Sequence, residues 1–158
     1  MASKAQLTRM RGVYLVAAEL ARHGFVASPP SRGASAADLL VTGEKAKHEF
    51  SVHVKTRFGR SQYWLISRKA VQLAPPWCVY VLVDLGERSG KGDGQVQYFV
   101  VPSAVVKEHC DKRSTAEWYW FPCRHAEQYR DKWDFFRESS HHDEGVIDPH
   151  PTNHAHQR

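Results

Sequence analysis

The sequence predicts an α/β domain in which helices flank a mixed β-sheet. Three observations predict this class: a helical apolar pattern comes first, strand-like apolar runs follow it, and helical patterns return after the later strands. The most hydrophobic run, at 77–85 with CVYVLVDL at its centre, is typical of a central strand buried on both faces. With 42% hydrophobic residues among 158, the chain can fill the core of one ordinary domain.

The first helix is expected over residues 6–23, where apolar side chains repeat at helical spacing and Gly24 provides a stop. Short apolar runs separated by Gly, Pro and Ser clusters then predict a series of strands. In chain order these strands are expected at residues 25–28, 38–42, 50–56, 63–67, 77–85, 98–101 and 118–121, the last as an edge strand.

Two further helices are expected in the second half of the chain. Pro102 is a favourable helix start, and a short helix should follow it. A closing helix is expected over residues 126–136, because Tyr129, Trp133 and Phe136 would share one of its faces. The sequence thus predicts one domain over residues 1–137 and a disordered, histidine-rich tail over residues 138–158.

Charge and cysteine content narrow the function classes. The net charge of +5 and pI of about 9.2 are compatible with a polyanionic partner, although many soluble proteins share such a charge and a well-solvated surface is the commoner explanation. Cys78, Cys110 and Cys123 are widely spaced and form no CxxC pair, which disfavours a metal finger or disulfide framework and favours the cytoplasm. No apolar run approaches the ~20 residues of a membrane span, so we expect no membrane contact.

Residues 36–56, AADLLVTGEKAKHEFSVHVKT, carry the strongest indication of chemistry. Asp38 heads an apolar run, and a strand-like segment seventeen positions on ends at Lys55. His53 and Lys55 share one face of that segment, because alternate strand residues point the same way. An acid, a metal-capable side chain and a lysine on neighbouring strands are the parts needed for metal-assisted phosphodiester hydrolysis.

Three segments in this order, GVYLVAAELARHGF, SPPSRGASAADLLV and FSVHVKT, resemble the PD-(D/E)XK nuclease superfamily in its small, Holliday-junction-resolvase-like form. The resemblance implies a restriction-endonuclease-like mixed sheet flanked by helices. It also implies Asp38, His53 and Lys55 as catalytic residues, with Mg²⁺ or Mn²⁺ held by Asp38 and His53. The implied partner is nucleic acid, with DNA favoured over RNA, and many proteins of this superfamily act as homodimers.

Two positions depart from the superfamily pattern. Val13 stands where the first helix often carries a glutamate, and His53 stands where the motif has an acid. Imidazole favours Mn²⁺ over Mg²⁺, so these departures weaken the metal site. Three functions therefore stay open: a metal-dependent endonuclease, a nuclease-fold module that binds DNA or RNA without cutting it, and a protein-interaction domain based on the aromatic segment 117–121.

Basic and aromatic residues outside the motif are candidates for nucleic-acid contact. Exposed arginines and lysines can follow a phosphate backbone, although an ordinary solvated surface is equally expected of them. The basic candidates are Arg32, Arg57, Arg60, Arg68 and Lys69. Aromatic rings can stack on bases, although packing in the core or at a strand edge is the commoner role. The aromatic candidates are Trp64, Trp118, Tyr119 and Trp120.

Overall fold

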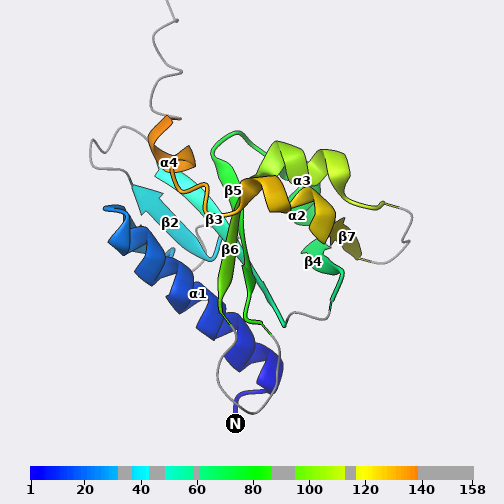
Figure 1. Ribbon diagram of the computed structural model, residues 1–158, viewed down its shortest axis with the longest axis horizontal. Helices are drawn as coiled ribbons and strands as arrows, with labels where there is room; N and C mark the ends of the chain where they lie inside the picture. Colours follow the sequence, from blue (N-terminus) through cyan, green and yellow to red (C-terminus); the bar gives the residue numbers. More distant parts are fainter. Residues whose placement is uncertain (32–36, 43–48, 59–60, 87–94, 113–116, 139–158) are drawn as a thin grey trace, which may run out of the picture.

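A five-stranded mixed sheet forms the centre of the molecule in the computed structural model, and a two-stranded sheet packs beside it (Figure 1). The structure describes residues 1–31, 37–42, 49–58, 61–86, 95–112 and 117–138. The strands are β1 (Val26–Ser28), β2 (Leu39–Thr42), β3 (Glu49–Arg57), β4 (Tyr63–Ser67), β5 (Cys78–Asp84), β6 (Gln97–Pro102) and β7 (Trp118–Pro122). The helices are α1 (Lys4–Arg22), α2 (Arg68–Leu73), α3 (Ser103–His109) and α4 (Phe135–Glu138), with 3₁₀ turns η1 (Cys123–His125) and η2 (Glu127–Tyr129).

The main sheet has the order β1-β2-β3-β5-β6, and the small sheet pairs β4 with β7. Strands β3 and β5 are parallel, whereas the other neighbours in both sheets are antiparallel. Every residue of β5 is buried, as the apolar run at 77–85 predicts. The predicted α/β class, with a mixed sheet flanked by helices, is confirmed.

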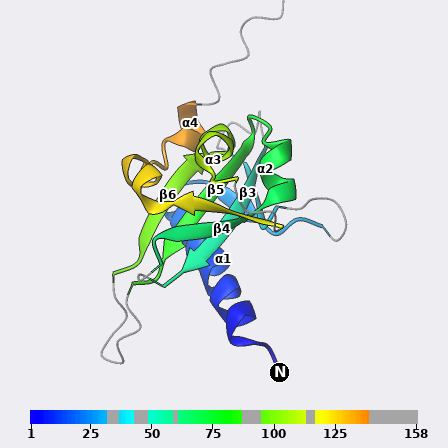
Figure 2. The same cartoon turned by 90° about the vertical axis from the view of Figure 1, so that its right-hand side faces the viewer.

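Each face of the main sheet has its own hydrophobic core. Val79, Val81 and Val83 of β5 pack with Val16 and Leu20 of α1 on one face. The alternate β5 residues face the small sheet and pack with buried side chains of β4 and β7. Figures 1 and 2 show α1 on one side of the main sheet, with β4, β7, α2 and α3 on the other. The small sheet, with α2 and α3, therefore covers the face of the main sheet opposite to α1.

Helix α1 has a defined start, stop and closest approach to the sheet. Ser3 and Gln6 form a reciprocal capping box at its N-terminus, and Gly24 follows its end with φ +88°. Gly12 is buried directly against Thr56 of β3, and a Cβ atom at this position would collide with the Thr56 hydroxyl. The glycine thus allows the N-terminal half of α1 to lie close to the end of β3.

The predicted closing helix over residues 126–136 is wrong. The chain there forms 3₁₀ turns and the short helix α4, with Asp131 between them at φ 52°. Trp133 and Phe136 are nevertheless buried against the core on the α1 side. Tyr129, which the prediction placed on the same face, packs instead against the core on the small-sheet side, and Arg130 forms a bridge to Phe99 of β6, which is incompatible with one continuous helix.

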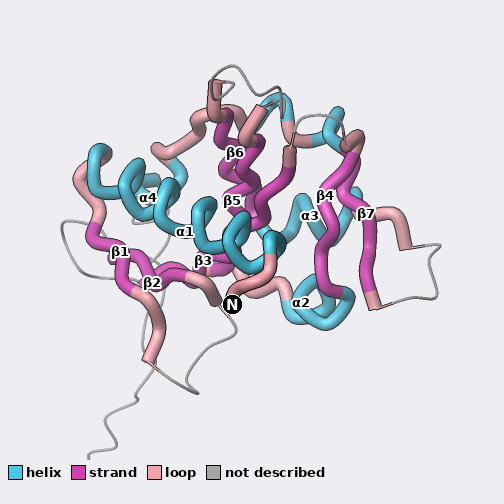
Figure 3. Tube along the Cα trace, turned by 90° about the horizontal axis from the view of Figure 1, so that it is seen from below, coloured by secondary structure: helices cyan, strands magenta, loops and turns pink. Residues whose placement is uncertain are grey.

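Two other differences concern the small sheet. Helix α2 was not predicted; it follows β4 directly and ends before Pro75. The predicted strand at 118–121 exists as β7, but it pairs with β4 and lies outside the main sheet. Figure 3 shows the small sheet set apart from β1 and β2, with α2 at its end. Pairing between strands so distant in sequence is set by packing rather than by local pattern.

Two further predictions concern membrane spans and the C-terminal tail. None of the helices within the described residues is both long and apolar enough to cross a membrane. The predicted disordered tail begins at residue 138, and all of it beyond Glu138 lies outside the described residues. The domain boundary at 137 and the cytoplasmic setting therefore stay predictions.

Candidate functional site

Asp38 closes the edge of β3 at the point where β2 begins. Its backbone N–H donates to the Val52 carbonyl at 2.9 Å, and its Oδ2 accepts from the Val54 N–H at 2.8 Å. Because β2 pairs with β3 only as far as Leu39, the carboxylate supplies an acceptor for the first amide beyond the ladder. Asp38 therefore does terminate a strand, and its carboxylate is held there with only 7% of the side chain exposed.

His53 and Lys55 lie on the face of β3 that is turned toward the small sheet. Both are half-buried, whereas the alternate residues Val52 and Val54 are buried in the core on the α1 side. The His53 ring stacks on Tyr80 of β5, with ring centroids 5.1 Å apart. The small sheet and α2 cover β5 and β6 but leave this part of β3 partly open, as the half-buried residues there show.

Burial lowers the pKa of His53, while Asp38 opposes that shift and Lys55 adds to it. Burial likewise lowers the pKa of Lys55. Asp38 opposes this shift, and the positive charge of Arg9 adds to it. These mutual effects place Asp38, His53 and Lys55 within one electrostatic neighbourhood. The structure thus brings the three residues together, and their catalytic roles stay predictions.

Arg9 is a member of this group that the sequence reasoning missed. Its guanidinium donates to Asp38 Oδ1 at 2.7 Å, while 72% of the Arg9 side chain stays exposed. Val13, where the resemblance expects a glutamate, packs one turn further along α1 against the hydrophobic core. Helix α1 therefore presents a cation to Asp38 where the superfamily pattern calls for an additional anion.

The residues present do not fit a Mg²⁺ site. Hard cations prefer several oxygen ligands, and Asp38 is the single carboxylate of this group. Its two oxygens already accept from Arg9 and from the Val54 N–H, and the His53 ring is stacked on Tyr80. No cluster of three His, Cys, Asp or Glu side chains suited to a metal exists among the described residues.

The basic residues predicted to contact nucleic acid fall into three groups, the last of which is Arg57 alone. Arg32 and Arg60 lie outside the described residues. Arg68 and Lys69 are exposed at the start of α2, directly after β4.

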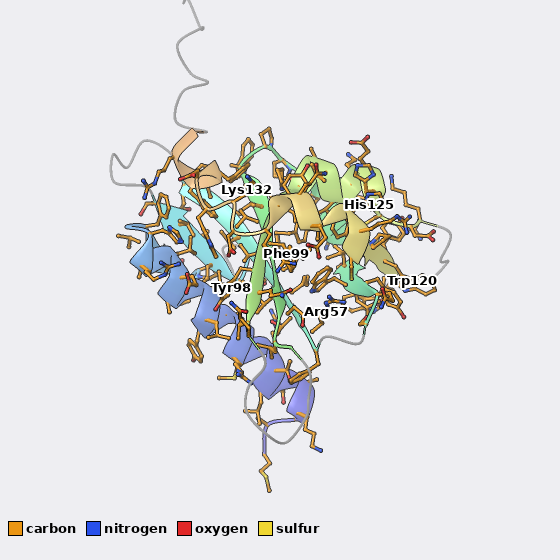
Figure 4. All side chains as sticks on the ribbon, in the orientation of Figure 1. Arg57, Tyr98, Phe99, Trp120, His125 and Lys132 are labelled. Atoms are coloured by element: carbon orange, nitrogen blue, oxygen red, sulfur yellow. The ribbon has the colours of Figure 1, made fainter. Side chains whose placement is uncertain are left out.

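Arg57 has a different environment from the other basic candidates. It donates to Asp84 Oδ2 at 2.7 Å and to Cys123 Sγ at 2.9 Å, and its guanidinium lies 4.1 Å from the centre of the Trp64 ring. Figure 4 labels Arg57 in the interior between the two sheets. With 14% of its side chain exposed, Arg57 is engaged within the protein, and its role as a phosphate contact stays a prediction without support from this geometry.

Burial raises the pKa of all three cysteine thiols, which disfavours a nucleophilic role for them. Burial raises the pKa of Cys78 and of Cys110 to about 11 in each case, so both thiols stay protonated at neutral pH. His109 stacks face to face on His125, with ring centroids 4.3 Å apart. This arrangement satisfies ring packing and gives no indication of a cysteine–histidine pair.

Comparison with solved structures decides the fold. The Holliday junction resolvase Hjc of Archaeoglobus fulgidus superposes with a TM-score of 0.51 at 13% identity, over 76% of this chain and 88% of that one. The bacterial homing endonuclease I-Ssp6803I gives a TM-score of 0.53 at 14% identity, over 89% of this chain and 96% of that one. The chain has a nuclease fold.

The resemblance drawn from the sequence motifs is thereby confirmed at the level of the fold. No protein-family model and no curated protein matches the sequence. Identity of 13–14% shows the fold alone and leaves the chemistry to be argued from this chain's own residues.

Proposed function

We propose that this protein binds DNA through phosphate contacts made by Arg9 and Lys55, and that it does so without metal-dependent cleavage. The observation that supports this proposal is the Arg9–Asp38 pair, in which a buried carboxylate holds a largely exposed guanidinium. The pair replaces the anionic site that a divalent ion would need with a fixed cation. The nuclease fold would then serve as a scaffold for recognition.

Arg9 has the properties of a phosphate ligand. A guanidinium carries five N–H donors, and the bond to Asp38 Oδ1 uses one of them. The remaining donors belong to a side chain that is 72% exposed, and a planar fork of donors matches the geometry of a phosphate. Holding the guanidinium in one place before binding also reduces the entropy lost on contact.

Lys55 adds a second cation in the electrostatic neighbourhood of Asp38 and Arg9, on the face of β3 opposite to the core beneath α1. Its pKa is lowered by burial and by Arg9, and an approaching phosphate would favour its charged form. His53 beside it is kept from protonation by burial and by Lys55 at neutral pH. Two cations and a neutral imidazole around one carboxylate form a site for an anion rather than for a metal ion.

The decisive test is binding in the absence of divalent ions. Fluorescence anisotropy with a labelled DNA duplex in EDTA should show binding that weakens steeply between 50 and 200 mM salt, because phosphate contacts release counterions. Arg9→Gln and Lys55→Gln should each weaken binding about fivefold or more and lower the salt slope by about one unit.

Arg22→Gln is the matched control. Arg22 lies on the same helix, pairs with the acidic Glu19 at 2.8 Å and is 67% exposed, so it resembles Arg9 in charge and exposure but lies away from Asp38. Equal losses for Arg9→Gln and Arg22→Gln would show that general charge, rather than this site, determines binding. DNA cleavage in Mn²⁺ that disappears with Asp38→Ala would overturn the proposal in favour of the endonuclease.

A further inference from the structure

The outer face of the small sheet is apolar. Side chains alternate along both strands, so that Trp64, Ile66, Tyr119 and Phe121 are buried against the main sheet. The residues between them point outward, and four are large hydrophobic side chains that are 39–49% exposed. We call these four residues the aromatic face: Tyr63, Leu65, Trp118 and Trp120. A sheet with one solvated face normally alternates apolar with polar residues, so this composition requires another explanation.

The rings of the aromatic face are already arranged for stacking. Leu65 is directly opposite Trp120 in the antiparallel register, and Ser67 is opposite Trp118. Tyr63 stacks on Trp120 with ring centroids 5.2 Å apart and an interplanar angle of 23°. Figure 4 places Trp120 at the outer edge of the molecule, away from α1. Rigid neighbouring strands thus hold flat rings on an exposed surface.

Basic residues border the aromatic face at both ends. Exposed Arg68 and Lys69 follow Ser67 at the start of α2, and exposed Arg124 follows Pro122 at the other end. Exposed Lys112 comes directly after Asp111, which forms a bridge to Trp120. Among these described neighbours, Asp111 and Glu117 carry the opposing charge, so the border is basic on balance.

From this arrangement we propose that the aromatic face binds unpaired bases of single-stranded DNA by stacking, while Arg68 and Lys69 contact the adjacent phosphates. Exposed rings flanked by cations are the combination that single-strand binding requires, because every base has a π-face and every nucleotide a charge. The basic border disfavours a second copy of this chain as the occupant, since the two copies would bring like charges together. This inference rests on the proposed DNA binding and assigns it a second, separate surface.

The test compares single-stranded and duplex DNA on the full chain in EDTA. Trp118→Ala and Trp120→Ala should each weaken binding to a labelled oligothymidine about tenfold, and Trp120→Phe should restore most of the loss. Binding to the duplex should stay within twofold, because the phosphate site at Arg9 is untouched. Trp77→Ala is the matched control, since Trp77 is 56% exposed and lies outside the aromatic face. Unchanged circular dichroism melting curves verify that the variants fold.

The outcomes separate this inference from the proposed function. If the wild-type protein binds oligothymidine and the tryptophan variants bind it equally well, the aromatic face is not the site, whereas the phosphate site stands. If the wild-type protein binds neither DNA form at 50 mM salt, the proposed function itself fails. A concentration-dependent dimer in sedimentation, dissociated by Trp120→Ala, would assign the aromatic face to a second copy and overturn the inference.

Discussion

Two aspartate–arginine pairs in this protein have the same geometry and opposite surroundings. In each pair a guanidinium nitrogen lies 2.7 Å from a carboxylate oxygen, and the aspartate side chain is less than one-tenth exposed. The arginines differ, because 14% of the Arg57 side chain is exposed against 72% for Arg9. The length of an ion pair therefore says little about its role, which depends on whether the cation is enclosed or presented to solvent.

The enclosed pair belongs to the connection between the two sheets. The parallel register of β3 and β5 sets Arg57 opposite Asp84, and Trp64 of the small sheet covers the guanidinium. Asp84 also accepts from the Gly86 N–H at 2.9 Å. The exposed pair instead joins α1 to the start of β2, where the cation has solvent on its other side.

The largest expected effect comes from breaking the enclosed pair. Arg57→Ala should lower the free energy of unfolding by about 3–5 kcal/mol, because it leaves the Asp84 carboxylate buried without its cation. Urea denaturation followed by tryptophan fluorescence measures this loss. Arg68→Ala, at an exposed arginine, should change stability by no more than about 0.5 kcal/mol. A similar small change for Arg57→Ala would mean that its enclosure contributes little to stability.

A second expected effect concerns the helix that carries Arg9. Gly12→Ala should cost about 1–3 kcal/mol, because the added Cβ meets the Thr56 hydroxyl and must displace α1 or β3. In a Thr56→Ala background the same substitution should cost clearly less, since the colliding hydroxyl is gone. Chemical denaturation of the four proteins gives the coupling energy. Additive losses would show that α1 does not approach β3 as described.

Breaking the exposed Arg9–Asp38 pair should affect stability less than breaking the enclosed Arg57–Asp84 pair. Arg9→Gln should lower the free energy of unfolding by no more than about 1 kcal/mol, because loss of an exposed guanidinium lets water reach the Asp38 carboxylate, which also keeps its bond from the Val54 N–H. The same urea experiment measures it beside Arg57→Ala. A loss approaching that of Arg57→Ala would remove the distinction between the two pairs. DNA affinity should show the reverse order, with Arg9 the more important.

The smallest expected effect is a pH dependence from His53, which lies beside the exposed pair. Its folded-state pKa lies below the usual 6.5, so the unfolded chain takes up a proton first as the pH falls. Stability should therefore decrease as the pH falls below about 6.5, until the folded state is protonated as well. In His53→Gln this part of the decrease should be absent. Denaturation midpoints between pH 5 and pH 8 compare the two proteins, and parallel curves would contradict the prediction.

Local sequence patterns predicted a helix or strand correctly where its hydrophobic residues followed a single clear pattern. The apolar run of β5, the alternation along β3 and the glycine after α1 each corresponded to the observed element. The spacing of Tyr129, Trp133 and Phe136 misled, because turns with a left-handed Asp131 bury Trp133 and Phe136 in one core and send Tyr129 to the other. Patterns report which side chains face inward more reliably than the backbone path that brings them there.

The candidate site was predictable only in part, for a related reason. His53 and Lys55 share one face of β3 by strand alternation, and Asp38 reaches them because it stands directly before β2, the strand that pairs with β3. Arg9 approaches Asp38 from a helix 29 positions earlier, and Asp84 reaches Arg57 from 27 positions later. Both contacts depend on how the helix and strands pack. The sequence therefore could not show which arginine is enclosed and which is exposed.

The hydrogen bond from the Val54 amide to Asp38 has a consequence of its own. A side chain, rather than a strand backbone, holds this one amide proton in place. Any event that draws the carboxylate away, such as capture of a metal ion, would leave that single proton free to exchange with solvent while its neighbours stayed protected. Hydrogen–deuterium exchange at the Val54 amide would therefore report, without any attached dye or tag, whether the Asp38 carboxylate is still bound there.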